Sequence, residues 1–493
     1  MKRIHARRCN SHLLRLPRSR LMTAMSIPRE PSVTPAPVTL TTALWDRRAR
    51  LTACVLGLGA FLTQFDVTAL VVVMPEIGRD LGLFMPGLAW VIDAYSLAFT
   101  AALLAAGALA DRHGRRRALL LGNALFATAS VACALAGTAP ALCVARAAQG
   151  IGAAFLITGA IASIAGTFPD PALRARALAL IGILSGVAMA LGPTLGGLLA
   201  AWLGWPAIFL ANILPCGLIA LAIPRFVGEA RRRVTPPLDW PGLLVLTGAL
   251  GLAVEGVLQA QAAPLAGLAG VAMSLALTVA FARRQGRRTH PLIDPALLSD
   301  RGVKAVIVLL LTISAGYWAV LVSLPAFLMA AHGMGAQEAG LALLAATLPM
   351  LVLPPAGGRM VRQCGWRRTF GSALALIAGG NAVLAGTALA GSQAVALALV
   401  GMAAIGAGSA LAHSQLTGAI VALAPSEAAG MASALTMVAR QSGFALGVAA
   451  LGVLAPTTPG GTGYAAVFAA AAIAGLVGLG ACFALPGGSD RPR

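Results

Sequence analysis

The chain consists of long apolar segments separated by short polar ones. Between residues 51 and 485, apolar runs of about 20 residues follow one another, which is the helical length that crosses the hydrocarbon core of a bilayer. No segment here alternates apolar and polar positions with the period of a strand, which argues against an outer-membrane barrel. The pattern predicts fourteen membrane-spanning helices, at 51–74, 88–110, 118–137, 140–165, 177–200, 205–224, 240–260, 264–282, 303–329, 338–357, 369–390, 393–420, 429–454 and 463–485.

The basic residues predict how these helices are oriented. With the N-terminus in the cytoplasm, all 36 Lys and Arg residues lie in or beside cytoplasmic segments, except Arg79, Arg146 and Arg440. Cytoplasmic segments of membrane proteins are enriched in Lys and Arg, so an incorrect set of spans would not give this distribution. The net charge of +20 therefore indicates membrane orientation, with both termini cytoplasmic, and not nucleic-acid binding.

Composition excludes a soluble globular protein. Hydrophobic residues make up 58% of the 493 residues, and the mean hydropathy is +0.85. The seven cysteines are scattered, with no spacing typical of a disulfide framework or a zinc site, so we expect neither a metal nor a cofactor. The first 50 residues hold eleven Lys and Arg without an apolar core of signal-peptide length, which predicts a disordered basic cytoplasmic tail at 1–50.

Glycine and proline positions recur at a nearly constant offset, which indicates two related halves. Single matches mean little in a chain with 57 glycines, but a constant offset is typical of transporters built from repeats. We expect an N-terminal six-helix bundle at 51–226, two inserted linker spans at 238–282 and a C-terminal six-helix bundle at 303–485. The recurring pairs are Pro75 with Pro325, Gly107 with Gly358, Gly114 with Gly365, Gly150 with Gly401, Gly192 with Gly443 and Gly196 with Gly447. Pro75 is expected to end the first span.

Three charged residues inside predicted spans are candidates for proton coupling. Counting 1.5 Å per helical residue places Asp66 roughly 22 Å from the cytoplasmic face, with Asp93 and Arg146 roughly 8 and 10 Å below the outer face. At this similar depth we expect the three to form a charged cluster. A nearby Arg favours an ionised carboxylate and exclusion of water favours a protonated one, so such a carboxylate can exchange protons as a cavity opens to either side. The alternative is a static buried salt bridge that holds three helices together.

A compact basic loop joins the second and third spans. It carries five charges in seven residues, and Gly114 supplies a turn that a residue without a Cβ makes at little cost. Gly107 lets neighbouring helices approach closely. We expect Asp111, Arg112 and Arg115 to hold the two bundles together in one of two access states, although a basic hairpin that only sets topology is the alternative.

The fourth and fifth spans carry glycine-rich motifs. Arg146 and Gln149 lie on one helix face, and the small residues that follow leave room for a neighbouring helix. In the fifth span, Gly192 and Gly196 form a small-xxx-small seam, and Pro193 removes a backbone hydrogen bond and bends the helix. Ordinary close packing of membrane helices is the alternative interpretation of the fifth span.

These motifs resemble those of the major facilitator superfamily. G-x-x-x-D-R-x-G-R-R from Gly107 resembles its loop between spans 2 and 3, and R-x-x-Q-G-x-G-x-A from Arg146 resembles its span-4 motif, which implies a role for Arg146 in proton transfer. The segment from Gly186 to Gly197 resembles the span-5 motif of its antiporters, which favours export over import. Three further segments, Asp66–Pro75, Trp90–Tyr95 and Ala439–Gly443, resemble spans 1, 2 and 13 of the fourteen-span drug:proton antiporter family, so the resemblance covers residues 45–485.

The substrate site is less legible. Phe65, Tyr317 and Trp318, with Gln149 and Arg440, are candidates for lining an apolar drug cavity, although aromatic residues in spans more often face lipid or packing. The second-half loop has a basic residue where the first has Asp111, and the thirteenth span carries a base and no acid that could bind a cation. These departures argue against recognition of dicationic drugs. Glu255, in the first inserted span, is expected at a contact between the insert and a bundle.

The fold class is therefore all-α integral membrane, with fourteen helices in two six-helix bundles and two inserted spans. The expected function is proton-coupled export of small amphipathic molecules or drugs by alternating access, with a dedicated metabolite exporter or an importer on the same fold as the alternative. No Walker A loop, HExxH or G-x-S-x-G segment is present, so neither an ATP-driven pump in one chain nor an enzyme is indicated. The expected partners are a small-molecule substrate, protons and the bilayer of a bacterial inner membrane, and a monomer is expected.

Overall fold

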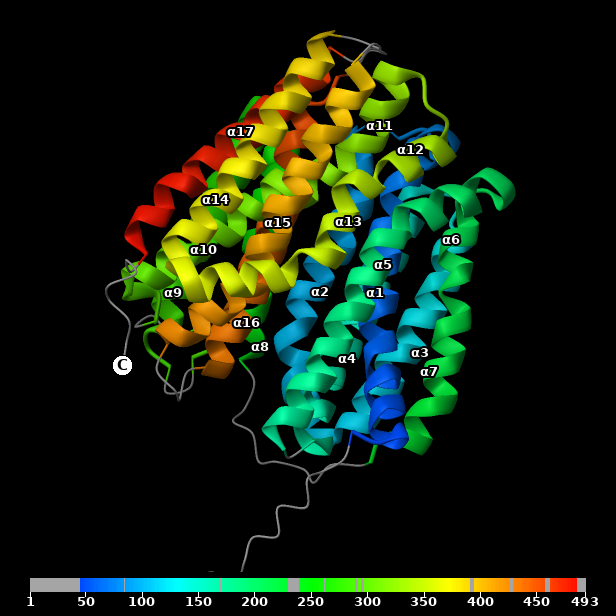
Figure 1. Ribbon diagram of the computed structural model, residues 1–493, viewed down its shortest axis with the longest axis vertical. Coiled ribbons are helices and arrows are strands. Elements are labelled where there is room, and N and C mark those ends of the chain that lie inside the picture. The colour runs from blue at the N-terminus through cyan, green and yellow to red at the C-terminus, as the bar shows by residue number, and fades with distance from the viewer. Residues whose placement is uncertain are drawn as a thin grey trace, which may run out of the picture. The chain divides into compact units, whose positions relative to one another are not determined.

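The computed structural model describes residues 45–83, 85–168, 170–228, 239–260, 262–288, 291–293, 297–390, 394–424, 429–456 and 462–485. The regular elements of these ranges are all helical (Figure 1). The predicted tail, apart from its last few residues, lies outside the described part. The elements are α1 (Arg47–Leu81), α2 (Met85–His113), α3 (Arg115–Ala134), α4 (Ala139–Thr167), α5 (Pro171–Leu203), α6 (Pro206–Ala211), α7 (Ile213–Phe226), α8 (Trp240–Leu258), α9 (Pro264–Gln285), η1 (Leu297–Ser299), α10 (Arg301–Ile313), the π-helical η2 (Ser314–Ala319), α11 (Val320–His332), α12 (Ala336–Ala342), α13 (Leu344–Val352), α14 (Pro354–Ala390), α15 (Val395–Leu423), α16 (Ala429–Leu454), α17 (Tyr464–Ala481) and η5 (Cys482–Ala484).

Twelve helices in the described residues are long and apolar enough to cross a membrane. Two further apolar helices, Gly87–Leu103 and Ala336–Val352, are shorter, and they fall where the second and tenth spans were predicted. The second of these is interrupted between α12 and α13 and contains Pro349. A multi-pass membrane protein is therefore confirmed, whereas the number fourteen is not.

The first helix is longer at both ends than its apolar run predicts. Asp46 Oδ1 accepts a hydrogen bond from the Ala49 backbone N–H at 2.7 Å, which caps α1 at Arg47 and corrects the expected tail boundary at residue 50. The prediction that Pro75 ends this helix is wrong, because α1 continues to Leu81. Pro75 lacks only its own backbone N–H, so α1 loses one hydrogen bond and continues past it. The helix ends at Gly82, whose φ of 63° is the left-handed conformation of a C-cap.

The repeat predicted from glycine spacing is present in the backbone. Gly114, between α2 and α3, has a φ of 109°, and Gly365, its counterpart, has a φ of 77° and kinks α14. Gly82 and Gly333 are a further pair at the same offset, with φ values of 63° and 66°. A residue with a Cβ would be strained at these positions, so the two halves need glycine at matching points of their chains.

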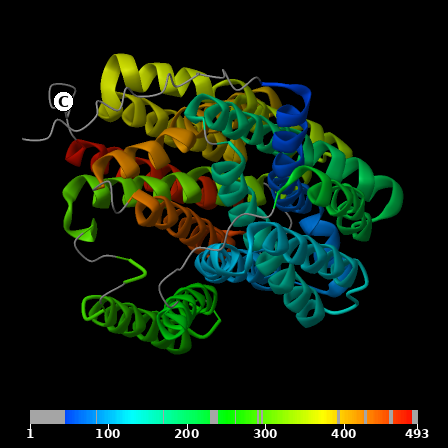
Figure 2. The same cartoon turned by 90° about the horizontal axis from the view of Figure 1, so that it is seen from below.

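Helix packing follows the same repeat. In the N-terminal half α1 packs along α5 and α3 along α4, and their counterparts in the C-terminal half, α10 and η2 with α16 and α14 with α15, are also in contact (Figure 1). Helices α8 and α9 form a pair, and α8 also contacts α2 and α16 (Figure 2). Contacts of α2 with α16, α1 with α11, and α5 with α12 and α13 join the halves.

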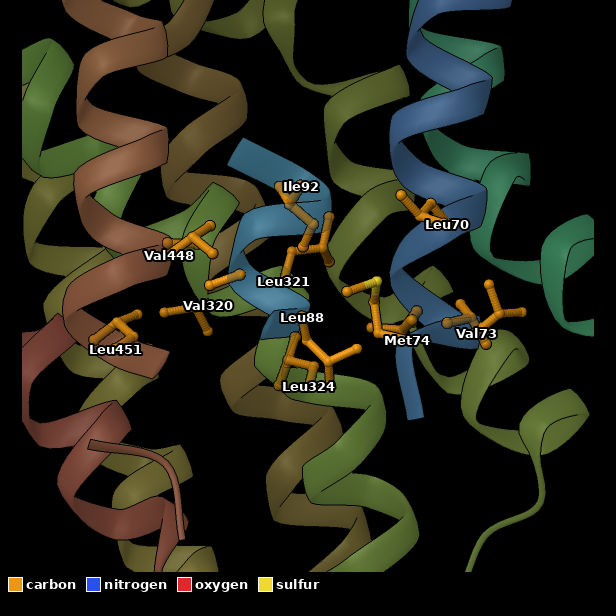
Figure 3. Close-up of a cluster of buried hydrophobic side chains, with 14 of the residues drawn as sticks. Leu70, Val73, Met74, Leu88, Ile92, Val320, Leu321, Leu324, Val448 and Leu451 are labelled. Atoms are coloured by element: carbon orange, nitrogen blue, oxygen red, sulfur yellow. The ribbon is translucent and has the colours of Figure 1, made fainter. Parts of the chain in front are cut away.

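One apolar core cluster draws on both halves. Figure 3 shows Leu70, Val73 and Met74 of α1 and two residues of α2 opposite side chains of α11 and α16, including Leu324 and Leu451. Apolar contact alone does not hold helices together in lipid as it does in water, so this close packing supplies much of the association between the halves.

Candidate functional site

A carboxylate on α1 and an arginine on α4 form a fully buried ion pair. Asp66 Oδ2 lies 2.5 Å from Arg146 Nη1, and the two side chains are 0% and 1% exposed. The other carboxylate oxygen, Oδ1, accepts hydrogen bonds from Gln149 Nε2 and Asn212 Nδ2, each at 2.8 Å. The Asp66 carboxylate therefore accepts three hydrogen bonds, two from side chains of α4 and one from Asn212 between α6 and α7. These bonds satisfy the carboxylate without water.

A second layer of hydrogen bonds fixes these donors. Arg146 Nη1 also donates to Gln149 Oε1 at 2.6 Å, and Gln149 Nε2 donates to Ser130 Oγ at 2.9 Å. Arg146 Nε donates to the backbone carbonyl of Val91 on α2 at 3.3 Å, and its guanidinium lies 4.4 Å from the centre of the Tyr95 ring. Buried polar networks of this kind hold one geometry, because each broken bond leaves a desolvated group.

The glycines of the span-4 motif explain how α4 meets α2 and α3 here. A Cβ at Gly150 would collide with the Tyr95 carbonyl oxygen, and one at Gly152 would lie 2.7 Å from the Phe126 backbone nitrogen. These two positions let α4 press against α2 and α3 at the level of the ion pair. The motif therefore supplies both the charged side chain and the space that buries it.

Asp93 does not join this network. Its side chain is 0% exposed, yet neither carboxylate oxygen has a hydrogen-bond partner among the described residues. Depth along a helix was estimated correctly enough to bring Asp66 and Arg146 together. The depth of a residue does not fix the direction in which its side chain leaves the helix. Arg146 contacts the Val91 carbonyl and the Tyr95 ring on one face of α2, and the Asp93 side chain leaves α2 on another face.

Three members of the network were missed from the sequence. Asn212 falls at the break between α6 and α7, and a polar residue inside an apolar run was a usable signal. Tyr95 and Ser130 carried no such signal, because aromatic and small hydroxyl residues are common in membrane helices. Among the described residues, no group of three His, Cys, Asp or Glu side chains could hold a metal ion.

The loop predicted to control access is partly described. Gly114 makes the turn, and the buried side chain of Arg115 reaches α4, where Nη1 donates to the Ala162 carbonyl at 2.6 Å. Arg112 is exposed. The Asp111 side chain lies outside the described residues, so the expected contact of this loop with the other bundle stays a prediction.

The span-5 motif faces two neighbours. A Cβ at Gly196 would lie 2.6 Å from the Ala69 carbonyl oxygen of α1, and one at Gly192 would collide with Thr68. On the other side of α5, a Cβ at Gly197 would lie 2.8 Å from the Ala336 carbonyl oxygen. A Cβ at Gly340 of α12 would likewise lie 2.8 Å from the Pro193 carbonyl oxygen. The motif therefore packs α5 against its own half and against the C-terminal half at once. Pro193 lies inside α5 without ending it.

An apolar cavity of about 160 Å³ lies between the halves. Figure 3 shows Met74, Leu88, Ile92 and Val448, four of the residues around it. None of the five residues predicted to line a drug cavity is among its lining residues. The full lining is Met74, Pro75, Leu88, Ala89, Ile92, Ala319, Val322, Ser323, Ala326, Val448 and Gly452.

Those five residues are divided between the two halves. Phe65 is buried and stacks on Phe61, and Gln149 belongs to the ion-pair network. Tyr317 is 0% exposed, and its hydroxyl donates to the Ala346 carbonyl, because a buried phenol needs a partner. Trp318 and Arg440 lie near each other in the C-terminal half, with His413 between them.

The insert is joined to the N-terminal half by a hydrogen bond. Trp90 Nε1 of α2 donates to Glu255 Oε2 of α8 at 2.8 Å, and Gln259 Nε2 donates to the other carboxylate oxygen at 2.8 Å. The expected contact between insert and bundle through Glu255 is therefore confirmed.

Comparison with known proteins agrees with this architecture. The Major Facilitator Superfamily model matches residues 56–448. Multidrug resistance protein Stp of Mycobacterium tuberculosis is 30% identical over 83% of this chain and 76% of its own length. The tetracenomycin C resistance and export protein of Streptomyces glaucescens is 32% identical over 82% of this chain and 75% of its own. Methyl viologen resistance protein SmvA of Salmonella typhimurium is 32% identical over 83% and 82%.

Solved structures share the fold at low sequence identity. A D-xylose–proton symporter superposes with a TM-score of 0.64 at 17% identity, covering 89% of this chain and 98% of its own. The peptide transporter POT in complex with sulfate gives 0.63 at 17% identity, covering 87% and 94%. With its helical repeat, its buried ion pair and a family model that matches most of its length, this chain belongs to the major facilitator superfamily.

Proposed function

We propose that the protein exports small amphipathic molecules, drugs among them, in exchange for protons, by alternating access. The observation that carries the proposal is the Asp66–Arg146 pair, a titratable carboxylate held in a closed network at the centre of the N-terminal half. The multidrug resistance and export proteins to which the chain is similar support the direction and the substrate class.

The network suggests how a proton could drive the change of state. Asp66 has no free lone pair directed to solvent, so a proton can be accepted only when Arg146 or an amide donor moves away. A protonated Asp66 no longer holds the Arg146 guanidinium by charge, and α1 and α4 are then free to separate. Release of the proton from Asp66 to the cytoplasmic side would restore the ion pair with Arg146 and the original packing.

Asp93 is a second candidate proton site. An ionised carboxylate buried with no hydrogen-bond partner is strongly disfavoured, so the neutral acid is the form that fits its surroundings. Asp93 lies on α2, the helix that contacts both Arg146 and α16 of the other half. Uptake and release of a proton there would change the contact between the halves.

Two motifs would set the balance between access states. The Gly192–Gly197 segment packs against both α1 and α12, so it couples movement of α5 to the C-terminal half. Asp111 and Arg112 would hold the cytoplasmic ends of the two bundles together, while Gly114 makes the turn and Arg115 fastens the loop to α4. Gly107 was expected to allow a close helix approach, but no described atom lies within 4 Å of where its Cβ would stand, so it has no such part here. In this proposal the protein is a monomer with fourteen spans, both termini in the cytoplasm, and the pair α8–α9 inserted between two six-helix bundles.

Dye efflux from pump-deficient bacterial cells tests the proposal. Cells are loaded with rhodamine 6G or, through its diacetate, with fluorescein, and efflux is followed with and without a protonophore. The wild type should lower the internal level of at least one dye, and both the protonophore and Asp66→Asn should abolish that effect. Asp46→Asn, which removes one carboxylate and keeps a helix cap, is the matched control.

Each other outcome contradicts a stated part of the proposal. If efflux persists in Asp66→Asn but is abolished by the protonophore, Asp66 is not the proton-coupling residue, and Asp93 becomes the candidate. Efflux insensitive to the protonophore would remove proton coupling. Accumulation instead of efflux, in cells whose membranes contain the protein, would indicate the alternative importer.

A further inference from the structure

Arg440 of the C-terminal half is a cation with no acidic partner among the described residues. Arg440 of α16 places its Nη1 2.9 Å from Nε2 of His413 on α15, and its Nη2 contacts the Met437 sulfur. Arg440 takes part neither in the ion pair at Asp66 nor in those at Asp239. A charge in the membrane interior is costly unless it is paired, and such residues mark ligand or ion pathways.

The groups in contact with Arg440 are neutral and supply no negative charge. A guanidinium has no acceptor, so His413 Nε2 is the acceptor in their contact and the ring is neutral there. The Trp318 ring lies 5.8 Å from the His413 ring, and its Nε1–H is buried without a hydrogen-bond partner. A cation on α16 and an unpaired donor on η2 therefore lie on either side of His413 of α15.

The cluster stands where the two halves meet. Met437, one turn before Arg440, packs against an apolar cluster of the N-terminal half, and Trp318 packs against the core cluster shared by both halves. Trp318 lies in η2, a π-helical segment, and such segments occur frequently at functional sites.

The apolar cavity uses the same helices. Ala319, the next residue after Trp318, lines it, and so does Val448, which is eight residues and therefore roughly 12 Å along α16 from Arg440. An amphipathic molecule with an apolar body and an acidic group could reach from one to the other.

We propose that Arg440, His413 and Trp318 form a binding site for an anionic group, and that the protein transports amphipathic molecules that carry a carboxylate. The guanidinium fork matches a carboxylate geometrically, and the Trp318 N–H supplies a further donor. This inference rests on the proposed function and narrows its substrate class. It also explains the missing acid of the thirteenth span, because a cationic substrate would be repelled by Arg440.

Dye binding to the purified full-length protein in lipid nanodiscs tests the site. Fluorescein and rhodamine 6G share a xanthene body, but fluorescein is anionic and rhodamine 6G is a cationic ester. Fluorescence polarisation should give saturable fluorescein binding whose Kd rises at least tenfold in Arg440→Gln, about threefold in Trp318→Phe, and not in Arg362→Gln. Arg362 is the matched control because it is an exposed arginine of the same half.

The opposite results would overturn the assignment. Absence of saturable fluorescein binding, or an unchanged Kd in both Arg440→Gln and Trp318→Phe, would do so. Displacement of fluorescein by millimolar chloride or inorganic phosphate would identify a small-anion site instead of a substrate site. If Arg440→Gln does not fold, the fluorescein Kd values of Trp318→Phe and Arg440→Lys test the site instead. Both variants should bind fluorescein more weakly than the wild type. Failure of the proposed function is distinguished by the cell assay, in which proton-dependent efflux of both dyes would be absent.

Discussion

Each half of the molecule holds an arginine within its helices, Arg146 fully buried and Arg440 partly buried, and their surroundings differ. Arg146 is matched by Asp66 and held by Gln149, so its charge is cancelled within the protein. Arg440 has a neutral histidine and a thioether beside it, and no acid among the described residues. The repeat gave both halves the same helices and glycine contacts, but the charges differ. The N-terminal half is suited to exchange a proton, and the C-terminal half is suited to accept a negative ligand.

A third arrangement, at the insert, has a buried carboxylate whose arginine partners reach solvent. Asp239, just before α8, accepts hydrogen bonds from Arg284 and Arg288, both at 2.8 Å, and both arginines are partly exposed. The hydrogen bond from Arg284 is the main reason that the pKa of Asp239 falls to about 2, with smaller contributions from Gly242 and Gln285. Water and ions reach this pair, which they do not reach at Asp66.

The largest effect is expected when Arg146 is replaced by methionine. Arg146→Met leaves the Asp66 carboxylate buried with two amide donors and no charge partner, and breaking a buried pair in this way costs about 3–5 kcal/mol. The thermal unfolding midpoint of the purified protein should fall sharply. Arg367→Met, at an exposed arginine above the Phe483 ring, is the control, and equal midpoints for the two variants would show that the ion pair does not stabilise the fold.

A smaller loss is expected from one amide donor. Asn212→Ala removes one of the hydrogen bonds to Asp66, and a hydrogen bond to a charged group contributes about 1.5–3 kcal/mol. Asn123→Ala removes a buried hydrogen bond to the neutral Cys216 carbonyl at 2.9 Å and should cost less. Chemical unfolding of the two variants measures the difference, and a larger cost for Asn123→Ala would contradict the charge argument.

Arg440→Met should leave stability almost unchanged. Among the described residues no acid loses its partner in this variant, and replacing a partly buried, unpaired charge with an apolar side chain of similar length should be neutral or stabilising, within about 1 kcal/mol. The measurement is the same thermal unfolding used for Arg146→Met. A drop as large as that of Arg146→Met would mean that Arg440 has a structural counter-charge, and the contrast between the halves would be lost.

The smallest effect is expected at Asp239, and it depends on pH. Because the pKa of Asp239 is lowered from 3.8 to about 2, its stabilising contribution is present above pH 3.8 and is lost as the pH falls to about 2. Above pH 4, wild type should exceed Asp239→Asn by less than about 1 kcal/mol, and salt should reduce the difference. Unfolding midpoints compared at pH 5 and pH 2 test this, and a difference that grows on acidification would have the wrong sign.

Much of the fold could be predicted because membrane helices leave a strong trace in the sequence. Apolar length located nearly all of the helices, and the spacing of Gly114 and Gly365 predicted a repeat that the backbone shows. Helix ends were less predictable. α1 extends past its apolar run because Asp46 and Gly82 set its ends by capping, which hydropathy does not register.

The sequence predicted how deep in the membrane the site residues lie, but not which face of each helix they occupy. Asp66 and Arg146 were expected at one level and do meet, whereas Asp93 was expected with them and has no partner. The His413–Arg440 contact joins α15 to α16, and a single sequence does not specify which faces of two helices oppose each other. Interhelix contacts of this kind depend on packing over the whole bundle.

The most direct test of the account is proton movement measured in proteoliposomes that contain the purified protein. A gradient of a dye that the wild type exports is imposed without a pH gradient, and a pH-sensitive fluorophore is enclosed. The account predicts proton flux opposite to dye flux in the wild type, and dye exchange without proton flux in Asp66→Asn. Proton flux of wild-type size in Asp66→Asn would contradict the claim that this buried carboxylate couples the two.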